Sequence, residues 1–317
     1  MVLDKLLNPK LLRSHPVYAI PTGFAFVVLG FVSSRLIFSS QVSLVMVAFS
    51  SLLMLPYVVK IFEYDELDVD IDDTSQEELG EWVKKCLRDG YSPQQIKDNL
   101  IRNNIDKPYD LFYDLAGVDE EYVKHMTSTN VFTRHMRTIA FYVYLFLGST
   151  LAFMLLFGLL DDMSVKEAFR NQLDVITPGP GGHFTGQKML ASIVSNNLKI
   201  TLICVLLSLM YGSGAIFILT YNASIAGVMY GTIIRTLVWG VNPLYSRWGS
   251  LIFYLPHTTL EIFAYLLAAI SGGILSKATV GSQEGSIRIW LKDGLMLFAM
   301  SLILIFIAGW IEVQVLL

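Results

Sequence analysis

Long apolar runs alternate with polar stretches along the 317-residue chain. Spanning the hydrocarbon of a bilayer takes about 20 mostly apolar residues in a helix. Seven runs approach that length, at residues 17–34, 36–59, 139–160, 198–221, 223–241, 251–276 and 294–311. Only Arg35 separates the first two runs, and the fifth contains Arg235. The pattern therefore predicts an all-α fold, a polytopic membrane helix bundle of about six to seven spans.

A polar insert at residues 62–134 interrupts this apolar pattern. It divides the chain into an N-terminal transmembrane hairpin (1–61), the insert itself, and a membrane domain (135–317). The insert opens with the acidic run EYDELDVDIDDTSQEE. Because crowded carboxylates repel one another and gain nothing by packing, this run predicts a solvated linker.

The remainder of the insert carries signals for short helices. Gly90 can end one helix, and Ser92 with Gln95 can cap the next. Residues 76–117 are therefore expected to form a small soluble helical module. We expect a cytoplasmic cap on the membrane domain, with a binding site for a protein partner as the alternative.

Composition and charge agree with membrane insertion and set its expected direction. The chain is 54% hydrophobic and 16% charged, against about 45–50% and 25% in an ordinary soluble domain. With a cytoplasmic N-terminus, 16 of the 23 lysines and arginines fall on the cytoplasmic side, as the positive-inside rule favours. The sequence thus predicts a multi-pass protein of the cell membrane. A net charge of −4 without a basic stripe argues against a nucleic-acid partner.

Several polar residues fall within the apolar runs, where they are costly and commonly functional. His257 and Glu261 lie one helical turn apart, about 9 Å and 15 Å below the outer start of the sixth run. Arg235 in the fifth run lies about 12 Å below the outer surface, between them in depth, and we expect it to be the counter-charge of Glu261. The full candidate site in the outer half consists of His257, Glu261, Arg235, Asn196, Asn197 and Glu312.

Small residues recur at four-residue spacing in the fifth and sixth runs. Gly227 and Gly231 form a GxxxG pattern, while Gly272 and Gly273 each follow an alanine by four positions. Such spacing lets helices approach closely in lipid. It predicts close packing of helices within one chain, with a homodimer interface as the alternative.

Four short motifs occur together in the second half of the chain. They are the Asn196-Asn197 pair that opens a span, NASIAG from Asn222, PHTTLE from Pro256 followed by AAISGG, and AGWIE from Ala308. With these motifs the chain resembles the stage II sporulation protein M family, over residues 189–312 and more loosely over the first three spans. Thr258 stands where that family usually has a glycine. For the family's namesake, the resemblance implies a non-enzymatic membrane organiser that anchors two cell-wall-degrading partners. No feature of this sequence identifies such a partner.

Three functions are compatible with these features. The first is a non-enzymatic scaffold whose buried polar residues fix helix packing. The alternative is a channel or secondary transporter in which His257, Glu261 and Arg235 bind or relay an ion or small solute. The third, an intramembrane metal hydrolase, is disfavoured because zinc hydrolases present three protein ligands and no HExxH occurs. No cofactor or metal is therefore expected, and the expected partners are the lipid bilayer, a second copy of the chain, and a protein bound by the 76–117 module.

Overall fold

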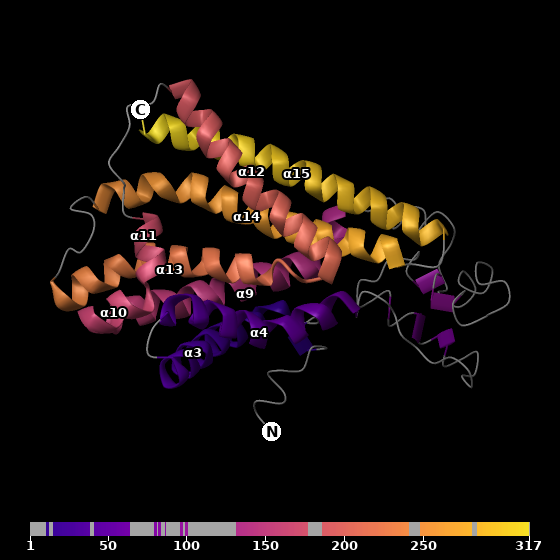
Figure 1. Cartoon of the computed structure of the whole chain (residues 1–317). Helices are drawn as coiled ribbons and strands as arrows, with labels where there is room; N and C mark the ends of the chain where they lie inside the picture. The colour runs from indigo at the N-terminus through magenta and orange to yellow at the C-terminus, as the bar shows by residue number, and fades with distance from the viewer. Residues whose placement is uncertain are drawn as a thin grey trace.

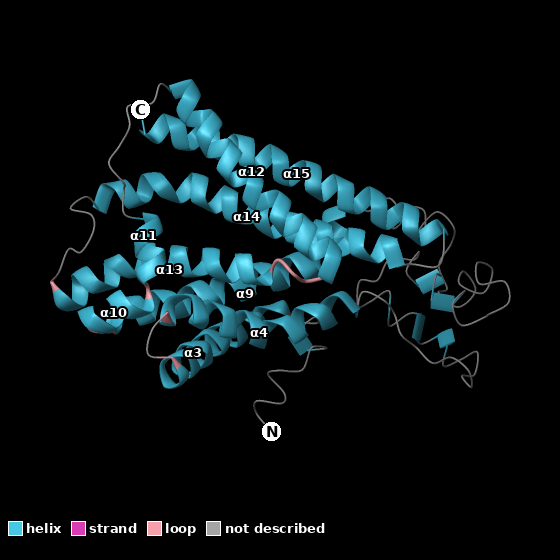
Figure 2. Ribbon diagram, in the orientation of Figure 1, coloured by secondary structure: helices cyan, strands magenta, loops and turns pink. Residues whose placement is uncertain are grey.

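The fold is built of helices. The computed structural model describes residues 11–12, 15–38, 41–63, 79–80, 82–83, 86, 96–97, 99–100, 131–176, 186–240, 248–280 and 284–316. Within these ranges every regular element is helical and no strand occurs, as Figure 2 shows.

Seven helices in the described ranges are long and apolar enough to cross a membrane. They are α3 (Ala19–Ile37), α4 (Val42–Glu63), α9 (Val131–Leu159), α12 (Gly186–Tyr211), α13 (Ile216–Trp239), α14 (Trp248–Val280) and α15 (Glu284–Leu316). A short 3-10 helix, η1 (Pro16–Tyr18), leads into α3, and two short helices, α10 (Asp162–Ala168) and α11 (Arg170–Ile176), follow α9. The predicted all-α, polytopic membrane bundle is confirmed.

The long helices pack in two groups, which Figure 1 shows one above the other. Helices α3, α4, α9 and α13 form a four-helix group, and α12, α14 and α15 form a three-helix group. Contacts between the two groups run mainly from α14 to α9 and α13, and from α15 to α9.

The two ends of the bundle differ in what they carry. Helices α10 and α11 lie at one end together with the C-terminus, and we call this the α10 end (Figure 1). At the opposite end, called the insert end, α4 ends and α9 begins, and the insert joins them. Because the helices alternate in direction, α12 and α14 begin at the α10 end and α15 ends there.

The boundary between the fourth and fifth spans lies earlier than the sequence pattern suggests. The expected break fell at Asn222, but α12 ends at Tyr211 and α13 begins at Ile216. Gly212 makes the turn with a φ of 67°, a left-handed conformation that favours glycine. Asn222 is instead inside α13, where its side-chain amide donates to the Ile218 carbonyl, 2.8 Å away. The amide is satisfied by its own helix, so an asparagine does not require a turn here.

The segment after α9 lies between the apolar runs 139–160 and 198–221, and its first part is helical. Arg235 contacts Asp162 at the start of α10, and Gln172 in α11 donates to Ser224, 11 positions before Arg235 in α13. Eleven residues of helix measure about 16 Å. The α10–α11 segment therefore turns back along α13 into the bundle rather than standing away from it.

Gln172 anchors this returning segment. Its side chain is fully buried. It accepts a hydrogen bond from the Ser43 hydroxyl at 2.6 Å and donates to the Ser224 hydroxyl at 2.9 Å. The backbone N–H of Asn171 also donates to Ser43, at 3.3 Å. One residue of α11 thus joins the first turn of α4 to the middle of α13.

Little of the insert is described, but what is described is helical. Leu79–Gly80, Trp82–Val83, Cys86, Ile96–Lys97 and Asn99–Leu100 all have helical backbone. Ile96 and Leu100 are fully buried. Most of the predicted 76–117 module and of the acidic linker lies outside the described residues, so the domain limits stay a prediction.

Candidate functional site within the membrane domain

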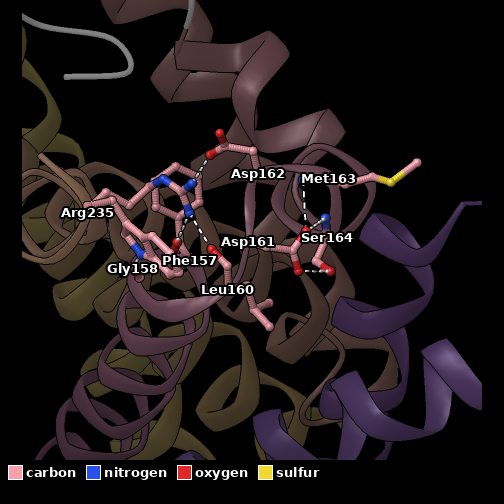
Figure 3. Close-up of polar contacts among 9 residues, drawn as sticks. Phe157, Gly158, Leu160, Asp161, Asp162, Met163, Ser164 and Arg235 are labelled. Carbon is pink, nitrogen blue, oxygen red and sulfur yellow. Dashed lines mark hydrogen bonds and ion pairs between the residues drawn. The ribbon is translucent and has the colours of Figure 1, made fainter. Parts of the chain in front are cut away.

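Arg235 is held at the α10 end by the last turn of α9 (Figure 3). One guanidinium nitrogen, Nη1, donates to the carbonyls of Phe157 at 3.0 Å and Leu160 at 2.7 Å. The other, Nη2, forms an ion pair with the Asp162 carboxylate. The guanidinium also lies over the Phe157 ring, 5.7 Å from its centroid. The arginine thus caps the C-terminal carbonyls of α9 and ties α13 to α9 and α10.

This geometry corrects the expected pairing of Arg235 with Glu261. Arg235 is directed toward α9 and α10, whereas Glu261 is bonded to α12. The depth of each residue along its own helix was compatible with a pair. Depth does not fix the direction in which a side chain points around the helix axis, and here the two point to different neighbours. Arg235 is therefore part of a structural lock at the end of α9.

Asp161 completes the turn beside this lock. Its carboxylate accepts hydrogen bonds from the backbone N–H groups of Met163 and Ser164 and from the Ser164 hydroxyl, at 3.1, 3.0 and 2.6 Å. This is an N-cap of α10, and Figure 3 shows it next to Arg235. The hydrogen bonds from Ser164 lower the pKa of Asp161 below its usual range. The carboxylate is therefore held ionised where α10 turns back.

Glu261 belongs to a polar cluster in the three-helix group. The Asn197 side-chain amide of α12 donates to Glu261 Oε1 on α14. Glu312 is half-buried near the end of α15, which packs against both α14 and α12. Each of the three helices thus contributes one side chain, two carboxyl groups and one amide. Asn197, Glu261 and Glu312 are called the carboxyl site below.

The other two predicted members lie on either side of this site. His257 is buried and stands one turn before Glu261 on α14, so it shares the face that packs inside the group. Asn196 is exposed, because adjacent residues on a helix point about 100° apart and its neighbour Asn197 faces inward. The structure therefore brings together Asn197, Glu261 and Glu312 with His257 next to them. Arg235 and Asn196 point elsewhere.

The predicted packing glycines lie at close helix contacts. A Cβ on Gly227 would come within 2.5 Å of the Phe153 Cβ, and one on Gly231 within 2.9 Å of the Met154 carbonyl oxygen. A Cβ on Gly272 would overlap the Val205 carbonyl oxygen. Gly273 is buried in the same stretch of α14. The contacts of Gly227, Gly231 and Gly272 are all within one chain.

Sequence reasoning missed several polar residues that the structure places inside the bundle, and it also missed Asp162, the exposed ion-pair partner of Arg235. The buried residues are Gln172, His135, Asp293, Tyr142, Thr201, Cys204 and Tyr265. His135 Nε2 and Asp293 Oδ2 lie 3.1 Å apart at the insert end, with side chains 8% and 1% exposed. The signal for most of them was spacing, because Asn197, Thr201 and Cys204 recur at helical intervals, as do His135, Thr138 and Tyr142. In the described ranges no three His, Cys, Asp or Glu side chains are grouped as metal ligands.

Seven membrane-length helices with charged and amide side chains enclosed between them define a polytopic integral membrane protein. The sequence model of the family described as stage II sporulation protein M matches residues 142–315. The chain belongs to this family. A search of curated proteins gave no match, and neither did a search of solved structures. The matched region runs from the middle of α9 to the last turn of α15, so the α3–α4 hairpin and the insert lie outside it.

Proposed function

We propose that the protein is a non-enzymatic transporter or channel that binds a proton or small cation at the carboxyl site. The observation that carries this proposal is the pair of carboxyl side chains, Glu261 and Glu312, within the three-helix group. Two carboxylates close together in a medium of low dielectric constant repel each other strongly. Uptake of a proton or a cation removes that repulsion.

The position of Arg235 supports this reading. An arginine close to the two carboxyl groups would neutralise one of them permanently. Arg235 instead binds Asp162 and the carbonyl groups at the end of α9. Its charge is therefore used at the α10 end, and the carboxyl site stays available to an exchangeable cation. Arg235 is therefore not part of the proposed transport site, although the sequence suggested that it was.

A membrane scaffold is the second candidate function. The family assignment favours it, and so does the position of the insert, which joins two spans outside the matched region. In this reading the 76–117 module binds a protein partner and the carboxyl site only fixes the packing of α12, α14 and α15. A multi-pass protein with a cytoplasmic N-terminus serves either function, and a homodimer is compatible with both.

Ion flux in proteoliposomes distinguishes the two functions. The purified full-length protein would be reconstituted into vesicles, and proton, Na⁺ and K⁺ fluxes measured separately with ion-sensitive dyes. If the protein is a transporter, one of the three fluxes should be well above that of protein-free vesicles. The Glu261→Gln variant, which keeps the shape of the side chain, should lose that flux. Glu167→Gln, on the short helix α10, is the matched control and should keep the flux. If the protein raises none of the three fluxes, the transport proposal is wrong and the scaffold reading stands.

A further inference from the structure

Buried polar side chains continue from the carboxyl site toward the other end of the bundle. On α14, Tyr265 follows Glu261 by one turn on the same face and is buried. On α12, Thr201 and Cys204 follow Asn197 at intervals of four and three residues, and both are fully buried. These spacings place each set on one face of its helix. The two faces meet, because α12 and α14 pack against each other and Asn197 bonds to Glu261.

This face meets the four-helix group at Tyr142 of α9. Helix α14 packs against α9, and Leu266, which follows Tyr265, lines a small cavity together with Tyr142. Tyr142 is buried. The polar faces of α12 and α14 therefore reach α9 beside Tyr142, across the boundary between the two groups.

The row continues along α9 to the insert end. Tyr142, Thr138 and His135 recur at intervals of four and three residues, and all three are buried. His135 then meets Asp293 of α15 at 3.1 Å. We call the whole set the polar row. It consists of Glu312, Glu261, Tyr265, Thr201, Cys204, Tyr142, Thr138, His135 and Asp293.

Helix α15 gives the length of the polar row, because it carries both ends. Glu312 and Asp293 are 19 residues apart on this one continuous helix, which corresponds to about 28 Å along its axis. The hydrocarbon core of a bilayer is about 30 Å thick. The polar row therefore extends over nearly the whole thickness of the core, with carboxyl groups at one end and a histidine–aspartate pair at the other.

We propose that the polar row is a proton path through the membrane domain. The proposal deepens the proposed function, since it rests on transport at the carboxyl site and names the proton as the transported ion. Na⁺ and K⁺ need several oxygen ligands at each position they occupy, whereas the middle of the row offers single hydroxyl and thiol groups. Such groups can accept one proton while releasing another, as chains of titratable residues do in pumps and transporters.

Transfer along the path leaves every member of the row unchanged. A carboxylate of Glu261 or Glu312 takes up a proton from the α10 end. Each following group accepts a proton from its neighbour and passes its own onward, and the His135–Asp293 pair releases one at the insert end. One proton and one positive charge have then crossed the bilayer, and no other reactant is consumed. The reverse direction uses the same steps.

The test is a proton-flux measurement on two tyrosines of the row. Full-length protein would be reconstituted in vesicles containing a pH-sensitive dye, with valinomycin and K⁺ to remove the membrane potential that proton movement creates. Tyr265→Phe and Tyr142→Phe each remove only the hydroxyl group and keep the ring in place. We expect each to slow the proton flux by about ten-fold or more, since a path in series fails at any missing group. Tyr230→Phe in α13, outside the row, is the matched control and should keep the wild-type flux.

Each outcome bears on one proposal in particular. If neither protons, Na⁺ nor K⁺ cross faster with the protein than without it, transport itself is wrong. If protons cross at the same rate in the wild type and in both phenylalanine variants, the carboxyl site works but the polar row is not the path. A flux of Na⁺ or K⁺ without protons also overturns the row. Should a phenylalanine variant fail to fold, as judged by gel filtration and melting temperature, Cys204→Ala gives the same decision.

Discussion

At the residue scale, the buried charges differ in how they are satisfied. Arg235 is 3% exposed at its side chain, while its partner Asp162 is 70% exposed. The pair is therefore unequal, since water can solvate the carboxylate but not the guanidinium. The protein compensates the buried member with two carbonyl groups and an aromatic ring as well. Replacing the arginine should therefore reduce the stability of the protein far more than replacing the aspartate.

We therefore expect Arg235→Leu to destabilise the protein strongly. The substitution leaves the Phe157 and Leu160 carbonyls without their donor, and each unsatisfied buried polar group typically costs about 1–3 kcal/mol. The matched control is Arg35→Leu, because Arg35 also pairs with an acid of α10, Glu167, but with side chains 40% and 37% exposed. That exposed pair should contribute less than about 1 kcal/mol.

Melting temperatures in detergent check this comparison. The melting temperature of Asp162→Asn should lie close to that of the wild type, because the Asp162 carboxylate is mostly solvated. Adding Glu261→Leu to Arg235→Leu should not restore stability, since the two residues bind different partners. Recovery in that double variant would show that Arg235 and Glu261 pair after all.

At the element scale, glycines decide how closely α12 and α14 approach. A Cβ on Gly272 would overlap the Val205 backbone carbonyl and lie 2.7 Å from the Ser208 Cβ. A Cβ on Gly309 of α15 meets only side-chain atoms, the nearest being Val194 Cγ2 at 2.8 Å. Side chains can change rotamer to make room, whereas a helix backbone must move as a whole.

Gly272→Ala should accordingly lower stability more than Gly309→Ala. We expect a loss of about 1–3 kcal/mol for the first substitution and a clearly smaller one for the second. The measurement is the melting temperature in one detergent, with both variants in the same background. Equal losses would contradict a close backbone contact between α12 and α14.

The returning α10–α11 segment depends on a single side chain in a similar way. Gln172→Leu keeps the volume approximately but leaves the Ser43 hydroxyl without its acceptor inside the bundle. An unsatisfied buried polar group costs about 1–3 kcal/mol, so the variant should melt lower than wild type. Asn171→Ala is the neighbouring control, because the bond from Asn171 to Ser43 uses its backbone N–H. If both variants melt alike, Gln172 does not hold the segment.

Sequence patterns predicted the long helices well and the short ones poorly, for a physical reason. A span of about 20 apolar residues is required by the thickness of the bilayer, so composition alone reveals it. The seven-residue helices α10 and α11 are too short to be stable alone and form through tertiary contacts such as Gln172–Ser224. The same limit applies to the candidate site. The spacing of His257 and Glu261 was enough to place them on one face of a helix, but the partner of Arg235 could not be predicted because it depends on how the helices pack.

At the scale of the whole molecule, the two ends of the bundle make the orientation testable. The natural cysteines Cys86 and Cys204 are both buried and are unsuitable as reporters of sidedness. Met163 on α10 is 82% exposed, and Lys60 near the end of α4 is exposed at the other end. Introducing a cysteine at either position leaves the buried contacts intact.

We expect a membrane-impermeant thiol reagent applied to intact cells to label Met163→Cys and not Lys60→Cys. This follows from the excess of lysine and arginine at the insert end. After the cells are opened, both variants should react, which confirms that each site is accessible. If only Lys60→Cys is labelled in intact cells, the topology is the reverse of the expected one. The carboxyl end of the polar row then faces the cytoplasm.

The hydrogen bonds of the buried hydroxyl groups also bear on how the ribosome can deliver this chain to the membrane. Many of these groups donate to a carbonyl of their own helix, including Ser50, Ser51, Ser149, Thr201 and Thr220. Such helices can enter lipid one at a time without an unpaired hydroxyl donor. Three charged side chains that need another helix follow their partners in the chain. Arg235, Glu261 and Asp293 are synthesised after Asp162, Asn197 and His135, so each of these three side chains enters a membrane that already contains its partner.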